Sequence, residues 1–178
     1  ILDDEIGGHF KITVDDSYFI SQNYYNNTAI LKTNFKNNEC EFELIDYMPR
    51  FKNDDGSYYS SPEIHRILIP IKGNPKIKVE YHPKLEYSVG KTVNYLKKNF
   101  IVSIVEDKNY ETLFLYTDLD KKDILNGNEI LIDKKIFFCV SYNEKINIPN
   151  FDSIRLEYEK TKVYWLNWTN KNPQYKNY

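Results

Sequence analysis

The chain has 178 residues, a formal net charge of -2, and 16 Tyr and 10 Phe against six Gly and one Met. This composition is typical of a soluble β-rich protein and excludes collagen-like or Met-rich surfaces. Acidic and basic residues interleave, which argues against nucleic-acid binding, and no apolar run approaches the roughly 18 residues that cross a bilayer.

In the first 83 residues, alternation of polar and apolar side chains predicts strands separated by polar turns. The Gly7-Gly8 pair leads into the first of them, at 9–14. Further strands are expected at 18–25, 28–35, 39–47, 62–71 and 76–83, the last having the clearest period of two. The polar segment 52–61 is too long for a tight turn, so we expect a surface loop there.

In the second half, strands are expected at 92–95, 100–105, 112–116, 128–133 and 135–142, with a short helical turn within 118–126. After Pro149 the pattern changes, and Asp152-Ser153 is expected to cap a helix that continues to Trp168, with a strand at 153–158 as the alternative. Roughly ten strands without helix-strand alternation predict an all-β, antiparallel two-sheet sandwich. We assign the sandwich to 1–158 and a linker to 159–178.

The segment 39–50 combines a predicted strand with an abrupt end, because Pro49 cannot donate to a ladder. Asp46 near that end is a candidate catalytic acid, as are Asp3 and Asp4, and two such acids would suit a glycosidase. The simpler interpretation of each is a solvated or turn-capping carboxylate.

Neither a metal site nor a cofactor is predicted, because His9, His65 and His82 are scattered singly without zinc-ligand spacing. Cys40 and Cys139 lie in apolar runs and are expected to be buried, reduced thiols, and we expect a cytoplasmic protein.

Two tyrosine pairs, Tyr24-Tyr25 and Tyr58-Tyr59, are candidates for stacking on a sugar ring. Adjacent residues of a strand point to opposite faces, so we expect one tyrosine of each pair to face the core.

Several short segments, taken in their order and spacing, resemble the N-terminal domain of glycoside hydrolase family 15, which contains glucoamylases and archaeal-type trehalases. The resemblance covers most of the chain, although 93–150 match only in strand pattern. Its segments are 2–10, 27–35, Asp46-Tyr47-Met48-Pro49-Arg50, His65-Arg66-Ile67, Gly73, 83–87, Gly90, Thr161, Tyr164-Trp165 and Trp168.

The resemblance implies a large β-sandwich placed before an (α/α)6 barrel that hydrolyses α-glucosidic bonds with inversion. The two catalytic glutamates of that family belong to the barrel, so this chain is expected to be inactive alone. Its expected partners are its own catalytic domain and a glucoside or oligosaccharide substrate. Family members have further sheet before Asp3-Asp4, so an exposed edge and self-association are expected here.

The residues expected at the domain interface or substrate entrance are Asp46, Met48, Pro49, Arg50, Trp165 and Trp168. Two alternatives remain open: an autonomous carbohydrate-binding module, which requires a row of exposed aromatic rings, and a complete enzyme with two acids at a cleft.

Overall fold

The computed structural model describes residues 6–106 and 110–171. Within these ranges the strands form sheets of eight, three and two strands, in the orders β2-β3-β4-β7-β13-β11-β10-β9, β1-β8-β12 and β5-β6. The strands are β1 (His9–Thr13), β2 (Phe19–Tyr24), β3 (Leu31–Lys36), β4 (Glu41–Tyr47), β5 (Phe51–Lys52), β6 (Tyr58–Tyr59), β7 (Glu63–Lys72), β8 (Lys76–His82), β9 (Thr92–Leu96), β10 (Ile101–Val105), β11 (Thr112–Thr117), β12 (Glu129–Leu131) and β13 (Ile136–Tyr142). The helices are α1 (Lys121–Asn126), α2 (Phe151–Lys171) and a 3-10 turn at Glu86–Ser88.

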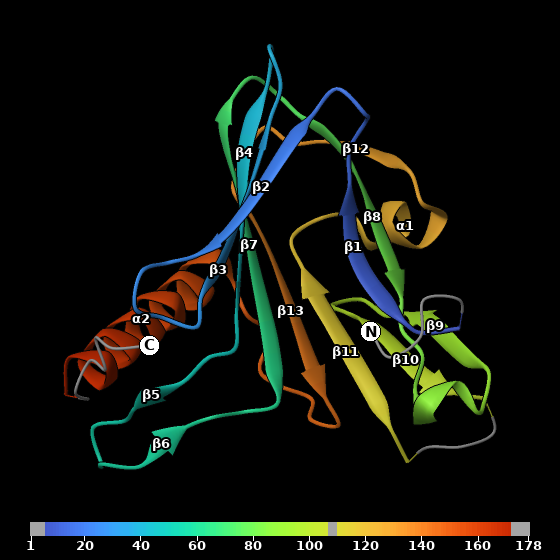
Figure 1. The fold of residues 1–178 in the computed structure, drawn as a ribbon. Helices are drawn as coiled ribbons and strands as arrows, with labels where there is room; N and C mark the ends of the chain where they lie inside the picture. Colours follow the sequence, from blue (N-terminus) through green and yellow to red (C-terminus); the bar gives the residue numbers. More distant parts are fainter. Residues whose placement is uncertain (1–5, 107–109, 172–178) are drawn as a thin grey trace.

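The molecule has three layers, with the eight-stranded sheet in the middle (Figure 1). The three-stranded sheet packs on one of its faces, and α2 runs along the other face beside the β5–β6 hairpin. All the strand pairings are antiparallel. The expected all-β, two-sheet sandwich is therefore confirmed, with a helix added outside the larger sheet.

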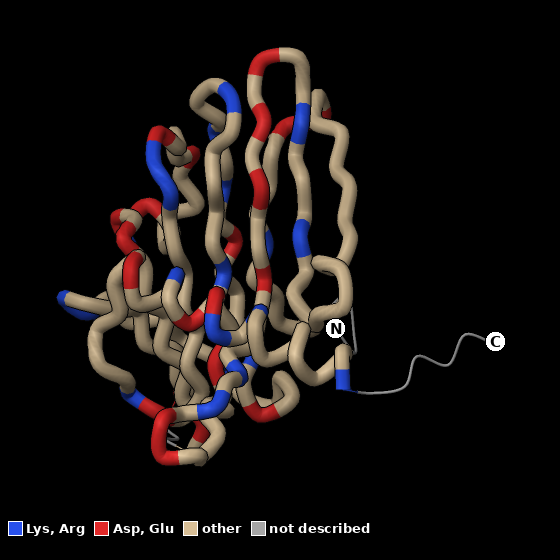
Figure 2. Tube along the Cα trace, turned by 90° about the vertical axis from the view of Figure 1, so that its left-hand side faces the viewer, with Lys and Arg blue, Asp and Glu red and all other residues tan. Residues whose placement is uncertain are grey.

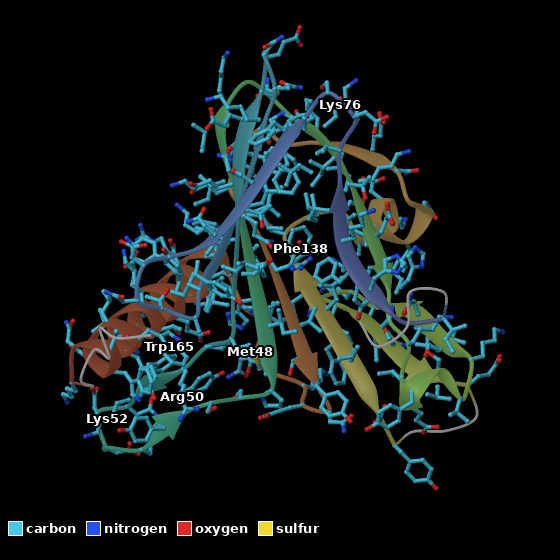
Figure 3. All side chains as sticks on the ribbon, in the orientation of Figure 1. Met48, Arg50, Lys52, Lys76, Phe138 and Trp165 are labelled. Atoms are coloured by element: carbon cyan, nitrogen blue, oxygen red, sulfur yellow. The ribbon has the colours of Figure 1, made fainter. Side chains whose placement is uncertain are left out.

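The central strands separate two hydrophobic cores, because both of their faces are covered. On β4, Leu44 faces the core between the sheets, and its neighbour Ile45 faces the core beneath α2. Phe138 and Phe137 divide in the same way on β13, and Figure 3 shows Phe138 between the sheets. The strict alternation expected for a half-exposed strand is found instead on β8, whose apolar residues are buried and whose lysines are exposed.

The segment 52–61 differs from the surface loop expected from its polar sequence. Its ends pair as the β5–β6 hairpin, in which the rings of Phe51 and Tyr59 stack with centroids 4.8 Å apart. Gly56 turns the chain between them with a φ of 87°. The polar run therefore occupies a hairpin tip, and the pairing comes from the aromatic residues that flank it.

Helix α2 replaces the alternative strand at 153–158. Asn150, one position before the helix, accepts a hydrogen bond from Ser153 N (2.9 Å), and Ser153 Oγ accepts one from Asn150 N (3.1 Å). The cap is therefore Asn150 rather than the expected Asp152-Ser153. The assigned boundary between 158 and 159 falls inside this continuous helix, and the linker residues 172–178 lie outside the described part of the chain.

Lys and Arg residues interleave with Asp and Glu across the face of the molecule shown in Figure 2. Of the helices that the model describes, none is both long and apolar enough to cross a membrane.

Candidate functional site

Five of the six predicted site residues gather at one end of α2. Met48, Pro49 and Arg50 follow β4, and together with Trp165 and Trp168 they line a cleft of about 370 Å³. Figure 3 shows Arg50 and Trp165 close to each other in this region, with Met48 beside them. Ser60, Ser61 and Tyr164 complete the lining.

Arg50 connects three elements at this cleft. Its backbone N–H donates to Thr161 Oγ1 at 3.1 Å, and its Nε donates to the Tyr164 hydroxyl at 2.9 Å. Its Nη1 donates to Ser60 Oγ at 3.2 Å, and its guanidinium carbon lies 5.4 Å from the centre of the Tyr164 ring. The planar fork of an arginine suits several bonds at fixed angles, so Arg50 joins the end of β4 to the hairpin and to the helix.

Local sequence explains why these residues meet. Met48-Pro49 ends the strand because proline has no N–H for the ladder. The N–H of the next residue, Arg50, is therefore not used in the sheet and donates to Thr161 instead. Helical spacing of three or four residues places Thr161, Trp165 and Trp168 on one side of α2. The Trp165 and Trp168 rings lie 5.9 Å apart, nearly at right angles.

An open groove of about 700 Å³ lies next to the cleft, between the hairpin and α2. The rings of Tyr58 and Tyr164 lie 6.1 Å apart, while Tyr58 and Trp168 keep 59% and 53% of their surface exposed. The polar lining is supplied by Lys52, Asn53, Asp54, Glu159, Lys160, Asn167 and Lys171. Exposed ring faces bordered by carboxylates and amides are groups that can stack on a sugar and hydrogen-bond to its hydroxyls.

Asp46 lies apart from the other predicted site residues. It faces the opposite side of β4, where Oδ1 is 2.9 Å from Arg66 Nε, and it lines a second hollow between the eight-stranded and the three-stranded sheet. Asp3 and Asp4, its possible catalytic companions, lie outside the described residues.

The tyrosine pairs divide as the alternation of strand side chains predicts at the hairpin. Tyr58 is exposed, whereas Tyr59 stacks on Phe51 and donates its hydroxyl to Glu63 Oε1 at 2.9 Å. At the other pair, Tyr24 is exposed, while Tyr25 lies under Lys162, whose Nζ is 4.6 Å from the ring centre.

A buried polar cluster beneath α2 was not foreseen from sequence spacing. Glu63 and His65 lie two residues apart on β7 and share a face, and Cys139 of β13 stands directly opposite His65. All three are almost completely buried, and one potential ligand atom from each lies within 4.8 Å of the others. The β7–β13 register creates this group, so no local spacing rule could have found it.

Hydrogen bonds fix the orientation of the His65 ring. The Tyr47 hydroxyl donates its single proton to the carbonyl of Ile154 at 2.6 Å, so at 3.1 Å it can only accept from His65 Nδ1. Nδ1 therefore carries a proton, and Nε2 faces Glu63 Oε2 at 2.7 Å. Glu157 of α2 approaches Nδ1 at 3.4 Å.

The carboxylates of the cluster differ in their proton affinity. Burial alone would raise the pKa of Glu63, but hydrogen bonds from His65 and Tyr59 outweigh it and lower this pKa. Burial raises the pKa of Glu157, and it raises those of the Cys139 thiol and the Tyr47 hydroxyl as well. Glu63 is therefore ionised at neutral pH, while Cys139 and Tyr47 keep their protons.

The fold and these sites define a β-sandwich with a helix docked on the outer face of its larger sheet, an aromatic cleft at one end of that helix, and a buried polar cluster beneath it. No model of a known protein family matches the sequence, and no curated protein matches it.

Proposed function

We propose that the chain is the non-catalytic sandwich domain of a glycoside hydrolase of the glucoamylase and trehalase kind. In this proposal it supports a catalytic (α/α)6 barrel that follows α2 in the parent protein, which hydrolyses α-glucosidic bonds with inversion in the cytoplasm. The surface around Arg50 and Trp168 packs on the barrel near the substrate entrance.

One observation carries the proposal: two segments of the family resemblance that are far apart in sequence meet in space. The N–H of Arg50 and the hydroxyl of Thr161 are 111 positions apart and form a hydrogen bond. Tyr164, Trp165 and Trp168 then line the same cleft as Met48 and Pro49. A junction is held firmly when side chains from separate elements fix one another by hydrogen bonds, as Arg50, Thr161 and Tyr164 do here.

The lining of this cleft favours support over catalysis. Its described residues are aromatic, apolar, hydroxyl-bearing or, in Arg50, already hydrogen-bonded, and they include no carboxylate. Acid–base hydrolysis of a glycoside requires two carboxyl groups that flank the bond.

The test compares this 178-residue chain with the product of the reading frame that continues beyond Tyr178. We expect the longer protein to release glucose from trehalose or malto-oligosaccharides, initially as the inverted anomer, and the 178-residue chain to release none. A stop codon directly after Tyr178 would contradict the proposal. So would turnover by the chain alone that one Asp or Glu substitution abolishes.

A second candidate function, autonomous carbohydrate binding, is favoured by the open groove beside the hairpin. Trp168 lines the groove, so soluble glucans that bind there should quench tryptophan fluorescence saturably, and Tyr58→Ala should weaken the effect. Tyr24→Ala is the matched control, because Tyr24 is equally exposed but lies on β2. Quenching that is unaffected by Tyr58→Ala would argue against this groove.

A further inference from the structure

We propose that Glu63, His65 and Cys139 form a binding site for one divalent transition-metal ion of the zinc type, which ties β7 to β13 beneath α2. The inference goes beyond the proposed function and does not depend on it.

The three side chains offer the donors that zinc prefers: a thiolate sulfur, an imidazole nitrogen and a carboxylate oxygen. Cys139 Sγ lies 3.9 Å from Glu63 Oε2, which is close to the roughly 3.5 Å between neighbouring ligands of a tetrahedral ion with bonds of about 2.0–2.3 Å. His65 Nε2 and Glu63 Oε2 are closer together, at 2.7 Å, because they now share a proton. Inserting an ion between them requires a displacement of about 1 Å.

The surroundings of His65 match those of a metal-bound histidine. Such a residue presents one ring nitrogen to the ion and donates the other N–H to a carboxylate or a similar acceptor, which fixes the tautomer. Here Nδ1–H donates to the Tyr47 hydroxyl, Glu157 Oε2 lies 3.4 Å away without a hydrogen bond, and Nε2 is turned toward Glu63 and Cys139. Tyr59 likewise orients Glu63 through its other oxygen, Oε1.

A cleft adjoins the cluster on one side. Glu63 and His65 line this cleft of about 470 Å³ together with residues 144–150 and the start of α2. Three protein ligands leave the fourth position of a tetrahedral ion to a water molecule from this cleft.

An ion would replace the protons that the cluster now shares. His65 Nε2 lies 2.7 Å from Glu63 Oε2, and the Cys139 thiol lies 3.9 Å from the same oxygen. A divalent ion displaces the proton between Nε2 and Oε2 and the proton of Cys139 Sγ, forming metal–nitrogen, metal–oxygen and metal–sulfur bonds, and both protons leave to solvent. The ion, two anionic ligands and one neutral ligand sum to zero, so the low-dielectric interior holds no net charge.

The experiment titrates Co²⁺, a spectroscopic substitute for Zn²⁺, into the chelator-treated chain. We expect one equivalent to bind with a near-ultraviolet thiolate-to-metal absorption band, and binding to release about two protons per ion in weak buffer. Zn²⁺ should displace Co²⁺ and raise Tm by about 5 °C or more.

Matched variants assign the band to the cluster. Cys139→Ser should abolish the band, whereas Cys40→Ser, which removes the other free cysteine, should leave it unchanged. His65→Gln should weaken binding, and Tyr47→Phe, which removes the hydroxyl that orients His65, should lower affinity about 10- to 100-fold.

A control is needed for the histidines at the surface. The His9 and His82 rings lie 5.0 Å apart with Glu80 nearby, so this group can bind Co²⁺ without a thiolate. The double variant His9→Gln/His82→Gln should keep the thiolate band.

The proposal does not depend on the folding of the variants. Folded wild-type protein that binds Co²⁺ without a thiolate band, or that binds none at micromolar concentration, would overturn it. A band that disappears in Cys40→Ser and persists in Cys139→Ser would overturn it as well.

Discussion

Asp46 and Arg66 stand opposite each other on β4 and β7 and form an ion pair whose charges are largely withdrawn from solvent. The charged atoms are 2.9 Å apart, but Asp46 Oδ1 and Arg66 Nε do not meet the angles of a hydrogen bond. Burial raises the pKa of Asp46 more strongly than the charge of Arg66 lowers it. The cost of desolvation therefore exceeds the gain from the pair.

This balance predicts the effect of Asp46→Asn. Because folding raises the pKa of Asp46, the protonated form contributes stability in acid that is lost as the pH rises above the ordinary value of about 4 and through the folded pKa. Asn resembles protonated Asp, so at pH 3 the variant and the wild type should have equal free energies of unfolding. At pH 7 the free energy of unfolding of the variant should be at least that of the wild type, to within about 1 kcal/mol.

The measurement for Asp46→Asn is urea unfolding at both pH values, with Asp16→Asn at an exposed turn as the control. A loss at pH 7 well above about 2 kcal/mol would mean that the ion pair is net stabilising.

Thr161 allows a test of the contact between β4 and α2. It is completely buried, and its hydroxyl accepts the backbone N–H of Arg50. Thr161→Val keeps the shape but leaves that N–H without its acceptor, so we expect a loss of about 1–3 kcal/mol in the free energy of unfolding. Thr161→Ser keeps the acceptor and should lose less, and equal losses would point to methyl packing instead.

Individual contacts were predictable where they follow from local geometry. The opposite orientations of Tyr58 and Tyr59 follow from the period of a strand, and the alignment of Trp165 with Trp168 follows from the period of a helix. The meeting of His65 with Cys139 depends on which strands pair and in what register across residues 63 to 141. Neither the pairing of β7 with β13 nor its register can be predicted from a short segment of the sequence.

Among the elements, the turn between β7 and β8 depends most clearly on a glycine. Gly73 has a φ of 65°, and a Cβ there would lie 2.7 Å from the carbonyl oxygen of Glu39 and 2.9 Å from Cys40 Sγ. Gly127, after α1, has nearly the same φ of 66° but nothing within 4 Å of an added Cβ.

The two glycines separate backbone strain from steric overlap. Gly127→Ala should cost about 1 kcal/mol through its left-handed backbone alone. Gly73→Ala should cost at least about 1 kcal/mol more, because the neighbouring chain must move. Thermal unfolding measures both, and equal losses would show that the Glu39 segment yields easily.

The edge strand β2 is the element with the greatest exposure. All six of its residues are exposed, with Phe19 at 72%, so it offers unpaired backbone groups and an apolar side chain to a second molecule. We expect concentration-dependent self-association that Phe19→Lys suppresses. Sedimentation velocity measures it, with Val89→Lys, also highly exposed but away from this edge, as the control.

At the scale of the molecule, α2 belongs to the sandwich. Its buried residue Ile154 packs with Ile45, Ile67 and Tyr47 of the large sheet. A chain cut after Asn150 should therefore bind hydrophobic dyes and unfold with lower cooperativity than one ending at Lys171. Equal unfolding free energies for the two chains would instead make α2 a separate linker.

The sheet architecture was predictable because period-two patterns mark its strands, and the antiparallel class follows from the absence of intervening helices. The hairpin at 51–59 and the double burial of the central strands were harder to predict. Aromatic contacts override a polar run in the hairpin, and a strand covered on both faces loses the alternation that marks a half-exposed one.

The position of β13 has a consequence for biosynthesis. This strand joins the β2-β3-β4-β7 half of the large sheet to the β11-β10-β9 half, yet among the described residues it is the last strand to be synthesised. Each half consists mainly of hairpins between strands that are near in sequence, so each can begin to form as it leaves the ribosome. The two halves cannot pair with each other until β13 emerges, and α2 is synthesised later still. A pause in translation before residue 136 would therefore leave the edge strands β7 and β11 unpaired and prone to aggregation.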